Sequence, residues 1–237
     1  LIQYQKERRT NMKESSQHIK ALRISLVLLV TLFASALLFF VPPLAPAAEK
    51  SNTIVDEWLS VKAPPPPELK KVTVDPKTTA LLILDIQSPT CTTRPRCVAS
   101  VPKIQVLLAK AREKGVPVIY SLSRAGKPED IRQEVSPLTG EPIVQSSVDK
   151  FFKTDLENIL KEKKITTVIV TGTVAEGAVM FTATGAALRG LKVIIPVDGM
   201  SSDDTYREQY TAWHMINAPG SQRQTTLTSI DMISFRE

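Results

Sequence analysis

The sequence predicts a three-layer α/β/α domain of Rossmann-like type with a mostly parallel sheet. From residue 78 onward, short apolar runs alternate with stretches in which apolar side chains recur at helical spacing. This alternation is typical of parallel strands joined by right-handed helical crossovers. One of the runs, 80–86, is apolar except for Asp85, as expected for a strand that helices cover on both faces.

The first half of the predicted domain begins with the strand at 80–86. Residues 100–114 carry apolar side chains at intervals of three and four, which predicts an amphipathic helix that Gly115 ends. The next strand is expected at 116–122. The long stretch that follows, up to residue 147, has no clear period, and we expect its loops to cover a ligand pocket.

The second half continues the same rhythm. A helix is expected at 154–164, with Thr154 as its N-cap and Glu157 completing a capping box. The remaining elements are expected in the order strand 166–171, helix 176–189, strand 191–197, helix 204–216 and strand 225–230.

The first 47 residues have the three parts of a cleavable export signal. Basic residues follow Met12, the expected natural start, then come an apolar run at 24–41 and the small pair Ala45 and Ala47. We expect the protein to be exported to the periplasm or the extracellular space and to meet a membrane only through this segment. The alternative is an uncleaved membrane anchor formed by residues 24–41.

Residues 48–77 are expected to form a tether, and residues 78–237 the folded domain. The tether has room for one short helix at 52–61 and contains four consecutive prolines at 64–67, which favour an extended chain. Residues 1–47 hold six basic and two acidic side chains, so only two of the six net positive charges belong to the rest. This balance gives no case for nucleic-acid binding.

The two cysteines, Cys91 and Cys97, lie close together in the sequence. In an exported protein such a pair is expected to form a disulfide, and two free thiols are the alternative. A zinc site would need further ligands nearby. We therefore expect no metal and no cofactor.

Three segments resemble the isochorismatase-like cysteine hydrolases, a family that includes nicotinamidases. They are the strand that ends on Asp85, the stretch 144–156 around Phe151, and the strand, Gly172 turn and helix start at 167–183. In that family, an Asp ends the first strand, a Lys stands about six residues before the Phe, and a nucleophilic Cys opens the helix. The resemblance covers residues 76–235 and implies the same fold.

The resemblance places the catalytic Asp at Asp85 and the Cys position at Ala178. The gap-free register from Phe151 puts the Lys position at Gln145, although Lys150 is near enough to take that role if the loop is rearranged. The resemblance also implies a non-proline cis peptide between Thr173 and Val174.

A ligand is expected beyond the carboxyl ends of the strands, where parallel sheets bind small molecules. The residues expected to line this pocket are Gln87, Thr173, Val174, Ala175 and Asp198. Because Ala178 has no atom that can attack a carbonyl carbon, we expect an exported family member without cysteine chemistry. It would be a pseudoenzyme, or a small-molecule-binding or assembly subunit, and a homo-oligomer. The alternative is a hydrolase of C–N or ester-like bonds in which Asp85 and Glu176 activate a water.

Overall fold

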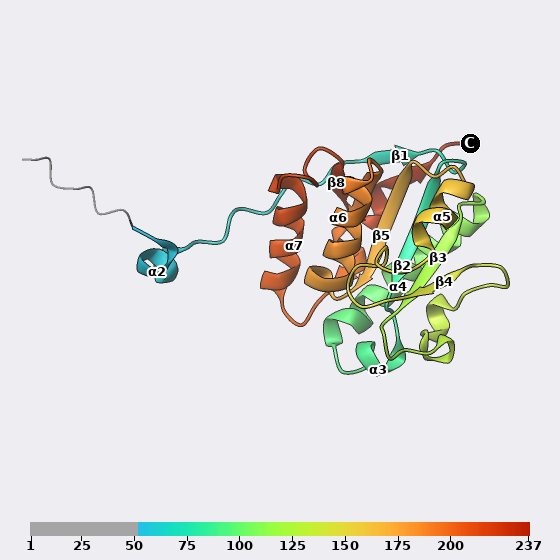
Figure 1. The fold of residues 1–237 in the computed structure, drawn as a ribbon, viewed down its shortest axis with the longest axis horizontal. Coiled ribbons are helices and arrows are strands. Elements are labelled where there is room, and N and C mark those ends of the chain that lie inside the picture. Colours follow the sequence, from blue (N-terminus) through green and yellow to red (C-terminus); the bar gives the residue numbers. More distant parts are fainter. Residues whose placement is uncertain (1–51) are drawn as a thin grey trace, which may run out of the picture. The chain divides into compact units, whose positions relative to one another are not determined.

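The computed structural model describes residues 52–237, and the chain divides into two units, Leu1–Lys62 and Ala63–Glu237 (Figure 1). In the first unit, helix α2 (Ile54–Glu57) runs into the short turn η1 (Trp58–Ser60). The predicted leader, signal peptide and alternative anchor lie outside the described residues. Between residues 52 and 237, no helix combines the length and the apolar character that crossing a membrane requires.

The second unit is built on a large sheet whose ladders are all parallel, in the order β4-β3-β2-β5-β6-β8, with β7 added beside β5. The sheet therefore confirms the predicted mostly parallel α/β fold (Figure 1). Its strands are β2 (Thr79–Leu84), β3 (Val118–Leu122), β4 (Ile143–Gln145), β5 (Thr167–Thr173), β6 (Lys192–Pro196), β7 (Met200–Ser201) and β8 (Thr225–Thr228).

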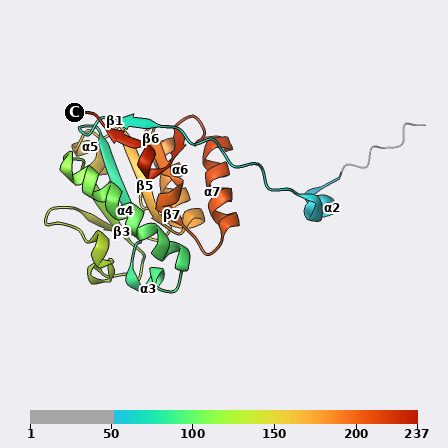
Figure 2. The same ribbon diagram turned by 180° about the vertical axis from the view of Figure 1, so that it is seen from behind.

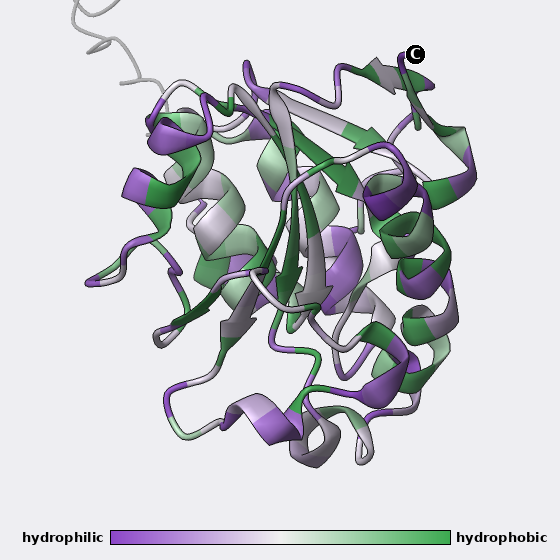
Figure 3. Ribbon diagram, turned by 90° about the vertical axis from the view of Figure 1, so that its right-hand side faces the viewer, coloured by the Kyte–Doolittle hydropathy of each residue, from purple (hydrophilic) through white to green (hydrophobic). Residues whose placement is uncertain are grey.

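Helices cover both faces of this sheet. Leu82 and Leu84 of β2 pack in one core with helices α5, α6 and α7, whereas Leu81 and Ile83 pack in a second core with α4. Because successive side chains of a strand point to opposite faces, these two cores define three layers. Figure 3 shows the largely hydrophobic strands between the two helical layers. The helices are α3 (Ser88–Cys91), α4 (Pro95–Glu113), α5 (Leu156–Glu162), α6 (Met180–Leu188) and α7 (Thr205–Asn217).

The expected capping box at the start of α5 is absent. The N-cap is Asp155, without a side-chain cap bond, and Glu157 instead forms ion pairs with Lys161 and Arg189. Thr154 still serves the helix start, because its Oγ1 accepts a hydrogen bond of 3.3 Å from the Leu156 amide. The helix therefore begins two residues later than predicted, and Glu157 is bound by Lys161 and Arg189 instead of completing a capping box.

The tether was predicted to continue to residue 77, and this boundary is wrong. Strand β1 (Val72–Val74) pairs in parallel with β9 (Ile233–Phe235), and Val74 packs in the core beside α4. Figure 2 shows β1 at the end of the large sheet, near β6. The Val-Thr-Val alternation is a strand pattern, and its partner lies at the opposite end of the sequence.

Two further regions differ from the prediction. Residues 123–147, expected to form only loops, contain the turns η2 (Pro128–Asp130) and η3 (Gln133–Val135) and the edge strand β4. The helix expected at 176–189 begins with a wide π-type turn, η4 (Ala175–Val179), in which Gly177 has non-helical φ and ψ of −111° and −105°. The chain therefore bends sharply between β5 and α6.

Candidate active site

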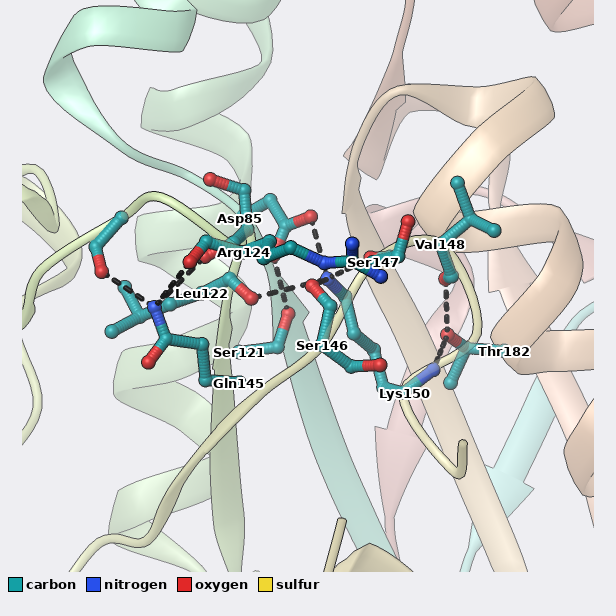
Figure 4. A network of polar contacts seen from close by, with 12 residues as sticks. Asp85, Ser121, Leu122, Arg124, Gln145, Ser146, Ser147, Val148, Lys150 and Thr182 are labelled. Carbon is teal, nitrogen blue, oxygen red and sulfur yellow. Dashed lines mark hydrogen bonds and ion pairs between the residues drawn. The ribbon is translucent and has the colours of Figure 1, made fainter. Parts of the chain in front are cut away.

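Asp85 stands immediately after β2, at the carboxyl end of the sheet. Its backbone is in the left-handed region, with φ of 54°, and the residue is only 7 % exposed. The Oδ1 atom accepts a hydrogen bond of 2.7 Å from the Ser121 hydroxyl on β3. The Oδ2 atom lies 2.8 Å from the ammonium of Lys150. Figure 4 shows these side chains pointing toward one another.

Lys150 is fully buried and binds three different parts of the chain. Besides Asp85, its Nζ donates to the carbonyl of Leu122 at 3.2 Å, where β3 ends. It also donates to the carbonyls of Ser146 and Ser147, at 3.2 and 2.6 Å. The ammonium thus joins the ends of β2 and β3 to the loop that follows β4 (Figure 4).

Burial raises the pKa of Asp85 above its ordinary value, while Lys150 and then Ser121 oppose this shift by stabilising the carboxylate. A buried carboxylate is stable only while its cation stays in place. Removal of Lys150 would leave an uncompensated charge in the core, which is among the most destabilising changes a domain can undergo. The pair is therefore part of the fold as well as of the site.

Gln145 does not contact Asp85, so the gap-free register from Phe151 predicted the wrong partner for this carboxylate. The amide of Gln145 donates to the carbonyls of Ser123, Arg124 and Gly126, at 3.0, 3.2 and 2.6 Å. The turn after β4 brings Lys150 back over the end of β3, and its long side chain reaches the carboxylate that Gln145 cannot. Lys150, the alternative considered from the sequence, is the cation of this site.

The loop that Gln145 holds covers Gln87, one of the expected pocket residues. Gln87 is 1 % exposed, and its Oε1 accepts a hydrogen bond of 2.9 Å from the Ser123 amide. A Cβ atom at Gly126 would lie 1.9 Å from the Gln87 amide nitrogen, so a larger residue there would displace the Gln87 amide. Gln87 therefore lies beneath a fixed loop.

Strand β5 leads to the second half of the site. At its end, Gly172 has φ of 131°, and a Cβ atom there would lie 2.1 Å from the carbonyl oxygen of Leu84 on β2. Only glycine permits this contact and this conformation. The next peptide bond, between Thr173 and Val174, is cis, as the resemblance implied. Thr173 is buried, and its hydroxyl donates to the Ser201 carbonyl at 3.2 Å.

Ala178 lies in the bend between β5 and α6, at the position where the resemblance expects the nucleophile. It is 3 % exposed and packs with Ala175 and Val179 in the core beneath α5, α6 and α7. Asp85 and Ala178 thus follow two adjacent parallel strands, because β2 and β5 pair directly. The structure brings these two sequence positions to the same end of the sheet.

Glu176 does not join Asp85. Its Oε2 accepts a hydrogen bond of 2.6 Å from the Ser202 hydroxyl, and its Oε1 lies 3.1 Å from the Arg207 guanidinium. Arg207 also pairs with Asp203 and Asp204, which anchors the start of α7. Each of the two carboxylates has its own cation, so the carboxylate pair required for the predicted water-activating hydrolase is not formed.

Asp198 belongs to another part of the molecule. Its Oδ1 accepts a hydrogen bond of 2.9 Å from the Ile230 amide, and its Oδ2 lies 3.0 Å from the ammonium of Lys103 on α4. The expectation that Asp198 shapes the pocket floor is therefore wrong, since both of its oxygens hold together elements on the α4 side of the sheet.

The predicted disulfide between Cys91 and Cys97 is confirmed. Both cysteines are fully buried in the core beside α4, and the bond joins α3 to the first turn of that helix. No free thiol remains in the chain. Among residues 52–237, three or more His, Cys, Asp and Glu side chains do not gather anywhere in a way that could hold a metal ion.

Two polar residues of the site were missed in the sequence. Ser121 binds Asp85, and Ser201, beside Thr173 in the β5–β7 ladder, is 1 % exposed with a hydroxyl that has no hydrogen-bond partner within the described part of the chain. A lone serine in the apolar run 118–122 was the available signal for Ser121. Ser201 belongs to β7, a strand of only two residues, which no sequence pattern reveals.

Comparison with known proteins agrees with this geometry. Residues 79–231 match the model of the isochorismatase domain. An N-carbamoylsarcosine amidase from Arthrobacter sp is 29 % identical over 124 residues, which cover 40 % of this chain and 47 % of the amidase. The chain therefore spans about half the length of the curated relative it matches.

Solved structures share the fold at low sequence identity. A cysteine hydrolase from Pseudomonas syringae pv. phaseolicola 1448A superposes with a TM-score of 0.59 at 21 % identity, covering 70 % of this chain and 94 % of that one. An N-carbamoylsarcosine amidase from Thermoplasma acidophilum has a TM-score of 0.57 at 19 % identity, with coverages of 65 % and 97 %. The nicotinamidase from Staphylococcus aureus superposes with a TM-score of 0.57 at 18 % identity, covering 65 % of this chain and 99 % of that one. The family match over most of the folded unit, with this shared architecture, shows that the chain belongs to the isochorismatase family.

Proposed function

We propose that this family member binds a small molecule without covalent catalysis. The observation that carries the proposal is Ala178, a methyl group in the bend between β5 and α6 where the resemblance expects a thiol. A covalent route needs a nucleophile there, poised by the start of the helix and a nearby cation.

Within residues 52–237, most of the thiol and hydroxyl groups at this end of the sheet are engaged in other bonds. Both cysteines are closed in a buried disulfide. The hydroxyl of Thr173 donates to a backbone carbonyl, and that of Ser202 donates to Glu176. Asp85, which would take the proton of a thiol, is bonded to Ser121 and Lys150. These bonds stabilise the carboxyl end of the sheet. The hydroxyls that contact a carboxylate there, those of Ser121 and Ser202, are both buried.

Ser201 supports binding of a ligand at this end. A buried hydroxyl without a partner is unfavourable, and a bound polar group would satisfy it. Its place beside Thr173, where the cis peptide follows, suits a ligand carbonyl. The names of the relatives indicate amides, so we propose a small amide- or carbamoyl-bearing ligand.

Calorimetric titration with N-carbamoylsarcosine and nicotinamide, combined with an assay for released ammonia, tests this function. We expect binding of at least one of them without ammonia release. Ser201→Ala should weaken binding about fivefold to tenfold, the effect of one neutral hydrogen bond. Thr79→Val is the matched control, because the buried Thr79 hydroxyl also has no partner among the described residues but lies at the opposite end of the sheet. Ammonia release lost on Asp85→Asn would overturn the proposal.

We also propose that the chain is exported and that the signal is cleaved after Ala47. The support is the basic and apolar pattern of the first 47 residues, together with the disulfide, a bond that persists in oxidising compartments. N-terminal sequencing of the mature protein from its host should begin at Ala48 or Glu49. A start at Met12 or Leu1 would contradict cleavage.

An assembly role is favoured by a separate observation. Tyr206, Tyr210 and Trp213 are exposed along one face of α7, and Phe181 and Leu188 are exposed on α6. Spacings of three, four and seven place such side chains on one helical face. We propose that these faces mediate a homo-oligomer, and that Trp213→Lys shifts the sedimentation coefficient to that of a monomer. Leu138→Lys, which changes an exposed apolar residue elsewhere, is the control.

A further inference from the structure

A cavity lies at the opposite end of the sheet from Asp85. It has a volume of about 540 Å³ and is bounded by β1 and by the residues at which β5, β6 and β8 begin. Figure 2 shows β1 near β6 at this end of the domain. Strands run the full depth of the sheet between this cavity and the candidate active site, so a ligand here would not touch Ala178.

The charges around this cavity are mainly positive. Lys192, Arg223 and Arg236 line it, and Asp75 is the one carboxylate among its lining residues. None of the three cations forms an ion pair with another described residue. By contrast, the arginines at 94, 96, 112, 132, 189 and 207 each have a carboxylate partner. Two of the arginines left without a partner therefore converge on one hollow.

Hydroxyl groups complete the lining. Thr78, Thr166, Thr167 and Thr226 contribute to the cavity wall, alongside Gln224. Hydroxyls and amides donate hydrogen bonds to oxyanions, and arginine adds a planar pair of N–H groups that match phosphate oxygens. An apolar ligand would leave these donors unsatisfied, so the cavity favours a polar, negatively charged ligand.

The three cations are exposed and have no carboxylate partner among the described residues, so each is available to a bound anion. The cavity volume is within the range of sites that bind small metabolites. We propose that this cavity binds a small multivalent oxyanion, of the diphosphate or phosphorylated-metabolite class, through Arg223, Arg236 and Lys192. This site is separate from the amide-binding site of the proposed function and does not depend on it.

Isothermal titration of the full chain with inorganic pyrophosphate tests the proposal. We expect saturable one-to-one binding that weakens as salt concentration rises. The double variant Arg223→Gln, Arg236→Gln should lower the association constant by about tenfold or more, since each charge-assisted bond is stronger than a neutral one. Lys192→Gln should have a smaller effect in the same direction, because lysine acts as a single point charge.

The matched control is Lys127→Gln with Lys163→Gln, which removes the same charge from exposed positions outside the cavity. The control should bind pyrophosphate as the wild type does. Absence of saturable binding to the wild type, or an equal loss in the control, would overturn the proposal. Thermal unfolding of each variant checks the fold. The double variant should keep its affinity for the amide ligand, which separates failure of this site from failure of the proposed function.

Discussion

The ends of β2 and β5 lie side by side but differ in what their side chains do. After β2, Asp85 is buried with Lys150 and Ser121, and the group binds strands and loop together. After β5, Gly172 and the bend that follows bring Ala178 into the same end of the sheet, where a methyl group packs in the core. The charged half of the site ties two strands and a loop together, whereas Ala178 contributes only a small packed side chain.

The largest effect on stability is expected for the buried pair of Asp85 and Lys150. Lys150→Met should lower the free energy of unfolding by about 3–5 kcal/mol at neutral pH, because it leaves Asp85 as an unpaired buried carboxylate. The raised pKa of Asp85 gives the sign of the pH dependence. A carboxyl whose folded pKa lies above its unfolded value contributes stability at low pH and loses it as pH rises through the folded pKa.

Lys150→Met should therefore be less destabilised at about pH 4–5 than at about pH 7, since Asp85 can then be neutral. Urea unfolding across this range measures the difference, and Lys163→Met, at an exposed position, is the control. A Lys150→Met protein as stable as the wild type at every pH would show that the pair contributes nothing to the fold.

The next effect tests the close contact between the two regions. Gly172→Ala should destabilise the protein by more than about 2 kcal/mol, because it combines an unfavourable backbone conformation with a clash against Leu84. Gly190→Ala has a positive φ of 81° but no atom within 4 Å of the added Cβ. This control should lose only about 1 kcal/mol, the conformational part of the effect. Equal losses would mean that β2 and β5 are not in contact at Gly172.

A smaller effect tests the role of Gln145. Gln145→Ala removes three hydrogen bonds to the loop 123–126 and should cost about 1–2 kcal/mol, because the side chain is exposed. Amide hydrogen exchange should quicken in that loop and remain unchanged at Asp85. Rapid exchange around Asp85 with an unaltered loop would contradict this role and would support the contact between Gln145 and Asp85 that the gap-free register predicted.

The effect most informative for chemistry is expected for Ala178→Cys. The change adds one sulfur at a buried position and should lower the free energy of unfolding by about 1 kcal/mol, the low end of the range for added core volume. Because the wild type has no free thiol, ultraviolet absorbance reports the introduced thiolate alone. We expect the pKa of that thiol to lie below the ordinary value of about 8.5, owing to the helix start and Lys150. A pKa above that value would mean that burial outweighs the helix start and Lys150, and that the bend does not stabilise a thiolate.

The sequence allowed the three layers, the order of most helices and strands along the chain, the place of Asp85 at the end of the first strand, the cis peptide and the disulfide to be predicted, because these depend on local patterns and on a resemblance of whole segments. It failed where a position depends on the path of a turn. Lys150 and Gln145 are five positions apart, and only the fold of the loop decides which one reaches Asp85. The pairing of β1 with β9 joins opposite ends of the domain, and no local pattern encodes that partnership.

Glu176 illustrates the same limit for electrostatics. Its nearness to Ala178 in sequence predicted a carboxylate pair with Asp85, but the helix α7 supplies Arg207, which holds it elsewhere. An arginine 31 residues away could not be assigned to it from spacing alone. Charges at the end of a sheet are thus predictable as a group, and their partners become known only with the structure.

Ammonia release from N-carbamoylsarcosine and nicotinamide, measured for the wild type and for Ala178→Cys in parallel, tests the central claim most directly. We predict that the wild type releases no more ammonia than the heat-unfolded protein, while Ala178→Cys, with Lys150 and Asp85 already in place, is the variant in which turnover can emerge. Steady turnover by the wild type that disappears in a folded Asp85→Asn variant would contradict the account, because catalysis would then proceed without a nucleophile at Ala178.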